Sequence, residues 1–531
     1  MSFISLGFLV FLVVSVFIYY LIPKKYQWIW LLTISYFFYL CSGIKTVFFI
    51  IFTTITTFLG AIVLSNIHIK RNEYFSKHKS EMSSDDKKEY KKVTKKKKRR
   101  TLILILIANF GVWAILKYTG FAIDNLNVVL KEFLHLENTV QRIDFILPMG
   151  ISFYTFQAMG YIIDVYQGKY EADKNIFKFA LFVSFFPQIL QGPIGRYNKL
   201  AHQFFEKHSF DWVRIQHGTQ LIAWGFFKKM VLADRAATVA DCAFKYVHLY
   251  SGIPMMYGVL MYAIQVYADF AGAMDIVVGA AELFDIQLEA NFRQPMFAVS
   301  ISDFWHRWHI TLGTWMKDYI FYPFSLSKVM NKFGKFARKL FGNTVGRILP
   351  ICIANLLIFF IVGIWHGPEW KYIAYGMYNG LLISLTNLLE PLYPKMFQLT
   401  HINPNTKVWK CIKIFRTFLL FYISLYFERA VSVYASFIML RNSITGFTFS
   451  ALSDGSLESL GLGVKGALIL LVGCSAWFIV SVLKEKGINV REAIDRKPFI
   501  IRWAIYIALV LAIPCLGKIS ETQGGFMYAQ F

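Results

Sequence analysis

The sequence predicts an all-α, polytopic membrane protein, with about 11–13 transmembrane or re-entrant helices around a central tunnel. Three observations lead to this fold class. Apolar runs recur along the whole chain of 531 residues. Only 17% of the residues are charged, whereas a soluble protein carries roughly a quarter. Gly and Pro break the apolar runs mainly in the middle of the chain. We therefore expect one membrane-embedded domain over residues 1–531.

The apolar runs supply the candidate spans. Residues 3–21 are 19 residues without a charge, enough to cross a hydrocarbon core of about 30 Å. A signal peptide is the alternative, but the run lacks a basic N-terminal region and a small-residue cleavage site, and further spans follow it. Spans are expected near residues 3–21, 28–42, 46–66, 101–119, 146–166, 178–194, 219–233, 254–281, 346–365, 370–388, 412–440, 463–483 and 499–517.

Helix-breaking residues indicate where the tunnel lies. Broken helices at membrane depth are tolerated where they are buried in protein or line a cavity. The middle of the chain is therefore expected to surround the tunnel. The breaks are Pro148 to Gly150, Pro187, Gly192 with Pro193, Gly272 and Pro295.

The formal net charge of +24 is unevenly distributed. Residues 70–100 contain 14 Lys or Arg and 5 Asp or Glu, a net charge of +9. Such a run in a soluble protein would indicate nucleic-acid binding. Between two spans it is better explained by the excess of basic residues in cytoplasmic loops, with contact to anionic membrane lipids as a second role. We expect 67–100 to be a cytoplasmic loop, the N-terminus to lie outside, and no nucleic-acid partner.

Polar residues inside apolar runs are the candidate functional residues, because charge at the bilayer centre costs at least about 2.5–3.5 kcal/mol. Gln265 and Asp269 lie four apart and share one helix face, and Asp275 follows. Two interpretations remain open for this segment. The side chains can form a hydrogen-bond network between helices, or they can contact substrate.

Histidines mark the second such zone. His306 and His309 are three residues apart, and we expect them on one face of a helix over 303–312, with Trp305 on the neighbouring face. Asp318 follows shortly after. His366 closes the run 346–365, directly after Trp365.

Three chemistries can use such histidines. A metal site would need three or four converging ligands, which the spacing of His and of the six scattered Cys does not supply. Acyl transfer through a Ser or Cys nucleophile would need a Gly-x-Ser-x-Gly elbow or a suitable Cys, and neither is evident. A histidine general base that deprotonates an acceptor hydroxyl needs only one well-placed imidazole. Buried structural histidines remain the alternative.

Motifs along the whole chain extend this interpretation. The chain resembles the membrane-bound O-acyltransferase (MBOAT) family, and within it the bacterial alginate O-acetyltransferase-like branch. The matching segments are PMGISFYTFQ at 148–157, YIIDVY at 161–166, FFPQ at 185–188, QGPIGR at 191–196, QVYADF at 265–270, NFRQP at 291–295, FWHRWHITL at 304–312, WHG at 365–367 and FMYAQF at 526–531.

The resemblance assigns roles to individual residues. It implies that His366 is the catalytic base and that His309 is the second family histidine, whereas His306 stands where relatives often carry Arg or Asn. The Ser-Gly-Tyr usual after the Asp-Phe pair is replaced here by Ala-Gly-Ala at 271–273, so no acceptor-binding role is transferred to that segment. Residues expected to line or support the substrate tunnel are Trp305, Arg307, Asp318, Asn291, Gln265, Asp269 and Trp365, with no metal ligand among them.

The resemblance also implies a function. An O-acyltransferase of this branch moves an acyl group, acetyl as the first choice, from a cytoplasmic thioester towards an extracytoplasmic cell-surface polysaccharide. The donor would be acetyl-CoA or another acyl thioester, with no bound cofactor. The partner would be an exported serine-hydrolase-like acyltransferase. The core motifs would occupy residues 146–390, and the extra spans over 410–531 favour this branch.

Two alternatives remain. The nearer one is D-alanyl transfer to teichoic acid, with a carrier-bound donor. The other belongs to a different class, a transporter or flippase of polysaccharide precursors, in which Asp, Gln and His would line a permeation path. The sequence shows no duplicated half, which counts against the transporter.

Overall fold

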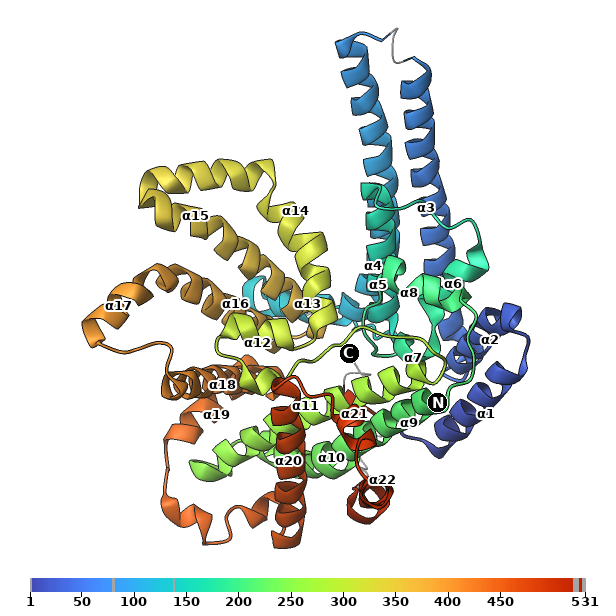
Figure 1. Ribbon diagram of the computed structural model, residues 1–531. Coiled ribbons are helices and arrows are strands. Elements are labelled where there is room, and N and C mark those ends of the chain that lie inside the picture. Colours follow the sequence, from blue (N-terminus) through green and yellow to red (C-terminus); the bar gives the residue numbers. More distant parts are fainter. Residues whose placement is uncertain (1, 79–81, 137–138, 519–524, 528–531) are drawn as a thin grey trace. The chain divides into compact units, whose positions relative to one another are not determined.

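The computed structural model describes residues 2–78, 82–136, 139–518 and 525–527, and throughout these stretches the regular secondary structure is helical, without a strand (Figure 1). The chain divides into two compact units. The first comprises residues 1–215 and 280–288, and the second comprises residues 216–279 and 289–531. The expectation of one domain over the whole chain stays a prediction.

In the first unit, α3 and α4 are the two longest helices. Its helices are α1 (Leu6–Leu21), α2 (Gln27–Leu40), α3 (Ile44–Lys77), α4 (Ser84–Val128), α5 (Ile151–Gln167), α6 (Ile176–Ser184), α7 (Phe186–Ile189) and α8 (Tyr197–Leu200).

The second unit holds the remaining helices, with α9 beginning before its first residue and α11 ending after residue 279. They are α9 (Trp212–Phe226), α10 (Asp234–Lys245), α11 (Ile253–Glu282), α12 (Ile301–Arg307), α13 (Ile310–Met316), α14 (Tyr322–Ser325), α15 (Lys328–His366), α16 (Trp370–Leu389), α17 (Tyr393–Thr400), α18 (Lys407–Arg429), α19 (Val433–Ile444), α20 (Val464–Glu485), α21 (Val490–Asp495) and α22 (Phe499–Leu516).

Six of the described helices are long and apolar enough to cross a membrane: α3, α4, α11, α15, α20 and α22. The shorter apolar helix α1 has 16 residues. The predicted class, an all-α multi-pass membrane protein, is confirmed. The number of crossings and the tunnel stay predictions.

The basic segment 67–100 is mostly helical, with residues 78, 82 and 83 outside the two helices, and its expected cytoplasmic position stays a prediction. Residues 67–77 belong to α3 and residues 84–100 belong to α4, and the two helices run side by side as a long hairpin (Figure 1); residues 79–81 lie outside the described part. Ser83 caps α4 in a capping box with Asp86. Tyr74 stacks on Tyr90 with ring centroids 4.4 Å apart. Lys and Glu are strong helix formers, so a charge run flanked by apolar runs can extend both helices.

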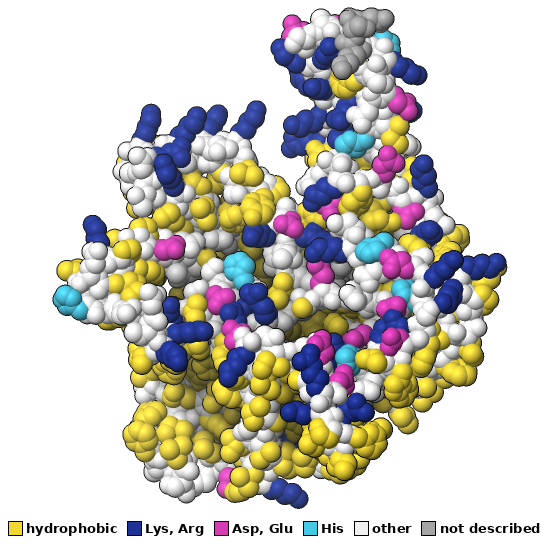
Figure 2. Space-filling model, viewed as in Figure 1, with side chains coloured by type: hydrophobic (Ala, Val, Ile, Leu, Met, Phe, Trp, Pro, Cys, Tyr) yellow, Lys and Arg dark blue, Asp and Glu magenta, His cyan; other side chains and the backbone are white. Residues whose placement is uncertain are grey.

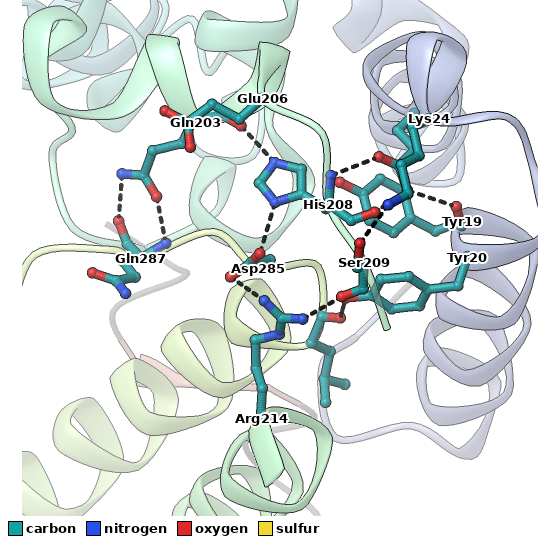
Figure 3. Close-up of polar contacts among 12 residues, drawn as sticks. Tyr19, Tyr20, Lys24, Gln203, Glu206, His208, Ser209, Arg214, Asp285 and Gln287 are labelled. Atoms are coloured by element: carbon teal, nitrogen blue, oxygen red, sulfur yellow. Dashed lines mark hydrogen bonds and ion pairs between the residues drawn. The ribbon is translucent and has the colours of Figure 1, made fainter. Parts of the chain in front are cut away.

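A polar cluster fixes the segment after α8 within the first unit (Figure 3). Nδ1 of the His208 ring lies 2.9 Å from the Asp285 carboxylate, and its Nε2 lies 2.7 Å from the Gln203 carbonyl oxygen. Arg214 forms an ion pair with the same Asp285. The His208 backbone N–H donates to the Gln27 side chain of α2 over 3.1 Å. One carboxylate therefore joins residues distant in sequence.

This cluster makes stability depend on pH. Burial by itself raises the pKa of Asp285, but the hydrogen bonds from His208 and Arg214 outweigh it and hold that pKa below its ordinary value. A carboxyl whose pKa is lowered by folding stabilises the protein above its unfolded pKa of about 3.9 and loses this contribution as the pH falls through the folded value.

We expect Asp285→Asn to lower the thermal unfolding midpoint of the detergent-solubilised protein at pH 7, since it leaves the buried His208 ring and the half-buried Arg214 guanidinium poorly paired, at a cost of about 1–3 kcal/mol. The gap between the variant and the wild type should narrow as the pH falls below about 4. Unfolding midpoints followed by tryptophan fluorescence at both pH values measure this. A gap that stays constant with pH would show that Asp285 contributes no linked stability.

Candidate functional site

Close packing of α15 on α16 sets the position of His366. A methyl group on Gly363 of α15 would lie 2.5 Å from the Tyr372 carbonyl oxygen. One on Gly376 of α16 would lie 2.1 Å from the Phe359 carbonyl oxygen. Only glycine lets the two backbones approach so closely. The helix α15 ends at His366, at the end of this contact.

The His366 ring is oriented by its own helix. Its Nδ1 lies 2.8 Å from the Val362 carbonyl oxygen. A carbonyl only accepts, so Nδ1 carries the proton of the neutral ring and Nε2 carries the lone pair. His366 is buried. This tautomer is the one a general base acting through Nε2 requires.

His309 lies in a turn between two short helices, and the expected continuous helix over 303–312 is wrong. The helix α12 ends at Arg307, and α13 begins at Ile310. Between them His309 adopts the left-handed conformation, with φ 46° and ψ 52°. The turn directs the His306 and His309 side chains differently: His306 is exposed, whereas His309 is buried.

Asn291 holds this turn. Its side-chain oxygen accepts from the Thr311 backbone N–H over 3.0 Å and from the Thr311 hydroxyl over 2.7 Å. The same oxygen lies 3.3 Å from His309 Nδ1, and the Asn291 backbone carbonyl accepts from Ile310 N–H over 3.0 Å. Nδ1 of His309 is therefore the donor, as in His366. Asn291 acts as a positioning residue for His309.

The Trp365 ring links the two histidines. Its centroid lies 5.6 Å from that of His309 and 4.9 Å from that of His366. Trp305 of α12 packs edge-to-face on Phe359 of α15, with centroids 5.2 Å apart. These aromatic contacts join the turn at 309 to the end of α15, so both imidazoles are held in one region of the second unit.

A pocket of about 310 Å³ contains both histidines. Its wall is mainly apolar and aromatic, with a few polar side chains, as is usual for sites that bind small molecules. The lining residues are Ser302, Trp305, His306, Trp308, His309, Ile310, Leu312, Gly313, Thr314, Met316, Lys317, Phe321, Asn355, Ile358, Phe359, Val362, His366, Ile383 and Asn387.

Four predicted site residues in or near this region do not line the pocket. Asn291 and Trp365 stand behind His309 and His366, as described. Arg307 pairs with Asp303 over 2.9 Å and with Glu485 over 2.8 Å, which ties α12 to α20. Asp318 lies in the π-helical turn Lys317–Phe321 and is exposed.

Gln265 and Asp269 lie in α11 and do not line the pocket, although the adjacent Phe270 ring lies 4.9 Å from that of His309. Asp269 pairs with Lys229 over 2.6 Å and accepts from the Met527 N–H over 2.9 Å. Lys229 also pairs with Asp234 over 2.9 Å. These contacts favour the network interpretation for Asp269, because a fully buried carboxylate needs such partners.

The polar lining residues that sequence reasoning missed include Asn355 and Asn387. Both interrupt apolar runs, which is the signal that singled out Gln265. It also set aside His306 and overlooked Lys317, although both line the pocket.

Comparisons with known proteins match the region that contains the pocket to a protein family. Residues 172–427 match the MBOAT, membrane-bound O-acyltransferase family, and the pocket lies within that range. A probable alginate O-acetylase AlgI of Pseudomonas putida is 35% identical over 274 residues, which are 51% of this chain and 52% of the relative. A protein of the same name from Pseudomonas aeruginosa is 30% identical over 374 residues, 70% of this chain and 65% of the relative.

A third relative, the peptidoglycan O-acetyltransferase of Helicobacter pylori, is 32% identical over 307 residues, 53% of this chain and 54% of the relative. The chain thus spans between about half and two thirds of the length of these curated relatives.

Proposed function

Because the chain belongs to the membrane-bound O-acyltransferase family, we propose that it is a membrane O-acyltransferase that transfers an acetyl group. The observation that carries this proposal is the pocket in which His366 and His309 meet, inside the family-matched region. Relatives named as alginate O-acetylase and peptidoglycan O-acetyltransferase support acetyl as the group transferred.

His366 is the proposed general base. Its Nε2 takes the proton of an acceptor hydroxyl, and the hydroxyl oxygen attacks the carbonyl carbon of an acyl thioester. The carbon–sulfur bond breaks, and the proton on His366 passes to the leaving thiolate. An ester and a free thiol result. His309, held by Asn291, positions the reacting groups within the same pocket.

The proposed donor is a cytoplasmic thioester, acetyl-CoA or a carrier-bound acetyl group. The proposed acceptor is a cell-surface polysaccharide, reached directly or through an exported serine-hydrolase-like acyltransferase. Names of the relatives support a polysaccharide acceptor. The aromatic and apolar wall of the pocket suits a narrow thioester arm rather than a polymer chain.

The test compares the host bacterium lacking this gene with the same strain carrying the wild type or His366→Ala. Alkali-released acetate is measured in the cell-wall and exopolysaccharide fractions. The proposal expects acetate to return with the wild type alone. Restored polysaccharide export without any change in ester content, for both versions, would support a transporter and overturn the proposal.

Donor access from the cytoplasm requires the orientation expected from the basic segment. A single cysteine in place of Ser84, at the exposed start of α4, should resist membrane-impermeant thiol reagents in intact cells and react after permeabilisation. The experiment needs a variant without the native cysteines, since three of the six are exposed. Ready labelling from outside would reverse the orientation and place the donor on the other side.

A further inference from the structure

The first arm of α15 is an amphipathic helix that precedes a sharp bend. Helical hydrogen bonding runs from Lys328 to His366, but Gly342 has a non-helical backbone, with φ 77° and ψ 171°. A methyl group on Gly346 would lie 2.4 Å from Arg338 Cα, and one on Gly334 would lie 3.3 Å from the Pro350 ring. Residues 328–341 therefore fold back along the start of the apolar second arm (Figure 1).

Three faces run along this first arm. Met330, Gly334 and Ala337 are buried. The lysine stripe consists of Lys328, Lys332, Lys335 and Lys339, which are all exposed and recur every three or four residues. The apolar flank consists of Val329, Phe336 and Leu340, whose exposed fractions are 68%, 60% and 62%.

Charge on this segment has one sign. Residues 328–347 contain six Lys or Arg and no Asp or Glu. Figure 2 shows Lys and Arg side chains standing in a row along this part of the surface. A helix with a basic face beside an apolar face, and with no acidic residue, has the composition of helices that lie in the interface of anionic membranes.

The position of residues 328–341 in the chain limits what can bind to this arm. The second arm is apolar enough to span a membrane, so its beginning near the bend lies at one membrane surface. The lysine stripe extends for about 17 Å along the helix axis, and charges at that spacing exclude the whole arm from the hydrocarbon core. The arm is therefore held at headgroup level, where phosphate groups meet its lysines.

We propose that residues 328–341 bind the headgroups of anionic phospholipids, with the lysine stripe contacting phosphates and the apolar flank inserted among the upper acyl chains. The four lysines attract the anionic surface, and the three large apolar side chains gain burial that the protein itself does not give them.

The test uses the full chain in nanodiscs of phosphatidylcholine alone or with phosphatidylglycerol. Hydrogen exchange of peptides covering 328–341 is followed by mass spectrometry. We expect exchange to be slower by about tenfold with phosphatidylglycerol, because bound headgroups suppress local opening. The difference should shrink at 1 M salt, where the screening length is about 3 Å.

Three variants isolate the cause. Changing all four stripe lysines to Gln should abolish the lipid dependence, whereas changing them to Arg should keep it. A matched control changes four exposed lysines of α4, at 91, 92, 95 and 96, to Gln. This variant loses the same charge, but the difference in hydrogen exchange of 328–341 between the two lipid mixtures should stay unchanged. Unchanged exchange of α16 peptides reports an intact fold.

Two results would overturn the proposal. One is equal exchange of 328–341 in the two lipid mixtures, which would leave the stripe to another partner such as an acidic protein. The other is a lipid dependence that survives the change of the stripe lysines to Gln.

Discussion

His366→Ala is expected to reduce acetyl transfer by about 10²–10⁴-fold, the usual share of general acid–base catalysis. The variant keeps the α15–α16 contact, because the glycines that allow it lie outside the substituted position. It loses the Nε2 lone pair that the hydrogen bond from Nδ1 to Val362 orients. Incorporation of labelled acetate into polysaccharide, normalised to protein in the membrane, measures the loss.

A matched control replaces a histidine outside the pocket. His401 is exposed after α17, and His401→Ala should leave activity unchanged. His366→Gln separates shape from chemistry, because it keeps a polar side chain without a base. Well-folded His366→Ala protein that still transfers acetyl groups at the wild-type rate would eliminate His366 as the base.

The second large effect separates two histidines of one motif. His309→Ala should lower the rate by about 10²-fold, the scale of a small misplacement of reacting groups. His309 is buried against Trp365 and held by Asn291. His306→Asn should keep substantial activity, because Asn retains a polar, hydrogen-bonding side chain at this exposed position.

The structure gives the reason for this difference. His306 is exposed, and its Nδ1 donates to the Ser302 carbonyl of its own helix over 2.6 Å. Asn can make a comparable local contact. Both variants need quantification in the membrane, because loss of a buried network also destabilises the fold. Equal loss of activity at equal protein levels would bring His306 into the catalytic machinery.

The apolar runs and the isolated polar residues were enough to predict the membrane class and to single out His309 and His366. Both signals can be recognised from neighbouring residues alone. A polar group within an apolar run requires a partner or a cavity. The same rule could have found Asn355. It could not assign Asp269, because whether a carboxylate meets Lys229 or a substrate depends on how distant helices pack.

Backbone geometry was the other feature that could not be predicted from the sequence. The spacing of His306 and His309 fits one helix face, and nothing in the sequence marks the break between Arg307 and Ile310. The hairpin of α3 and α4 was missed for a related reason. A run of charged residues is compatible both with a solvated loop and with a capped helix.

The left-handed backbone at position 309 has a consequence for which residues can replace His309. A side chain with a Cβ in that conformation costs about 1–2 kcal/mol relative to glycine. Glycine would relieve this backbone cost, but it would also remove the buried imidazole and its contacts with Trp365 and Asn291. On the role proposed for His309, this strained conformation is the cost of placing an imidazole in the pocket.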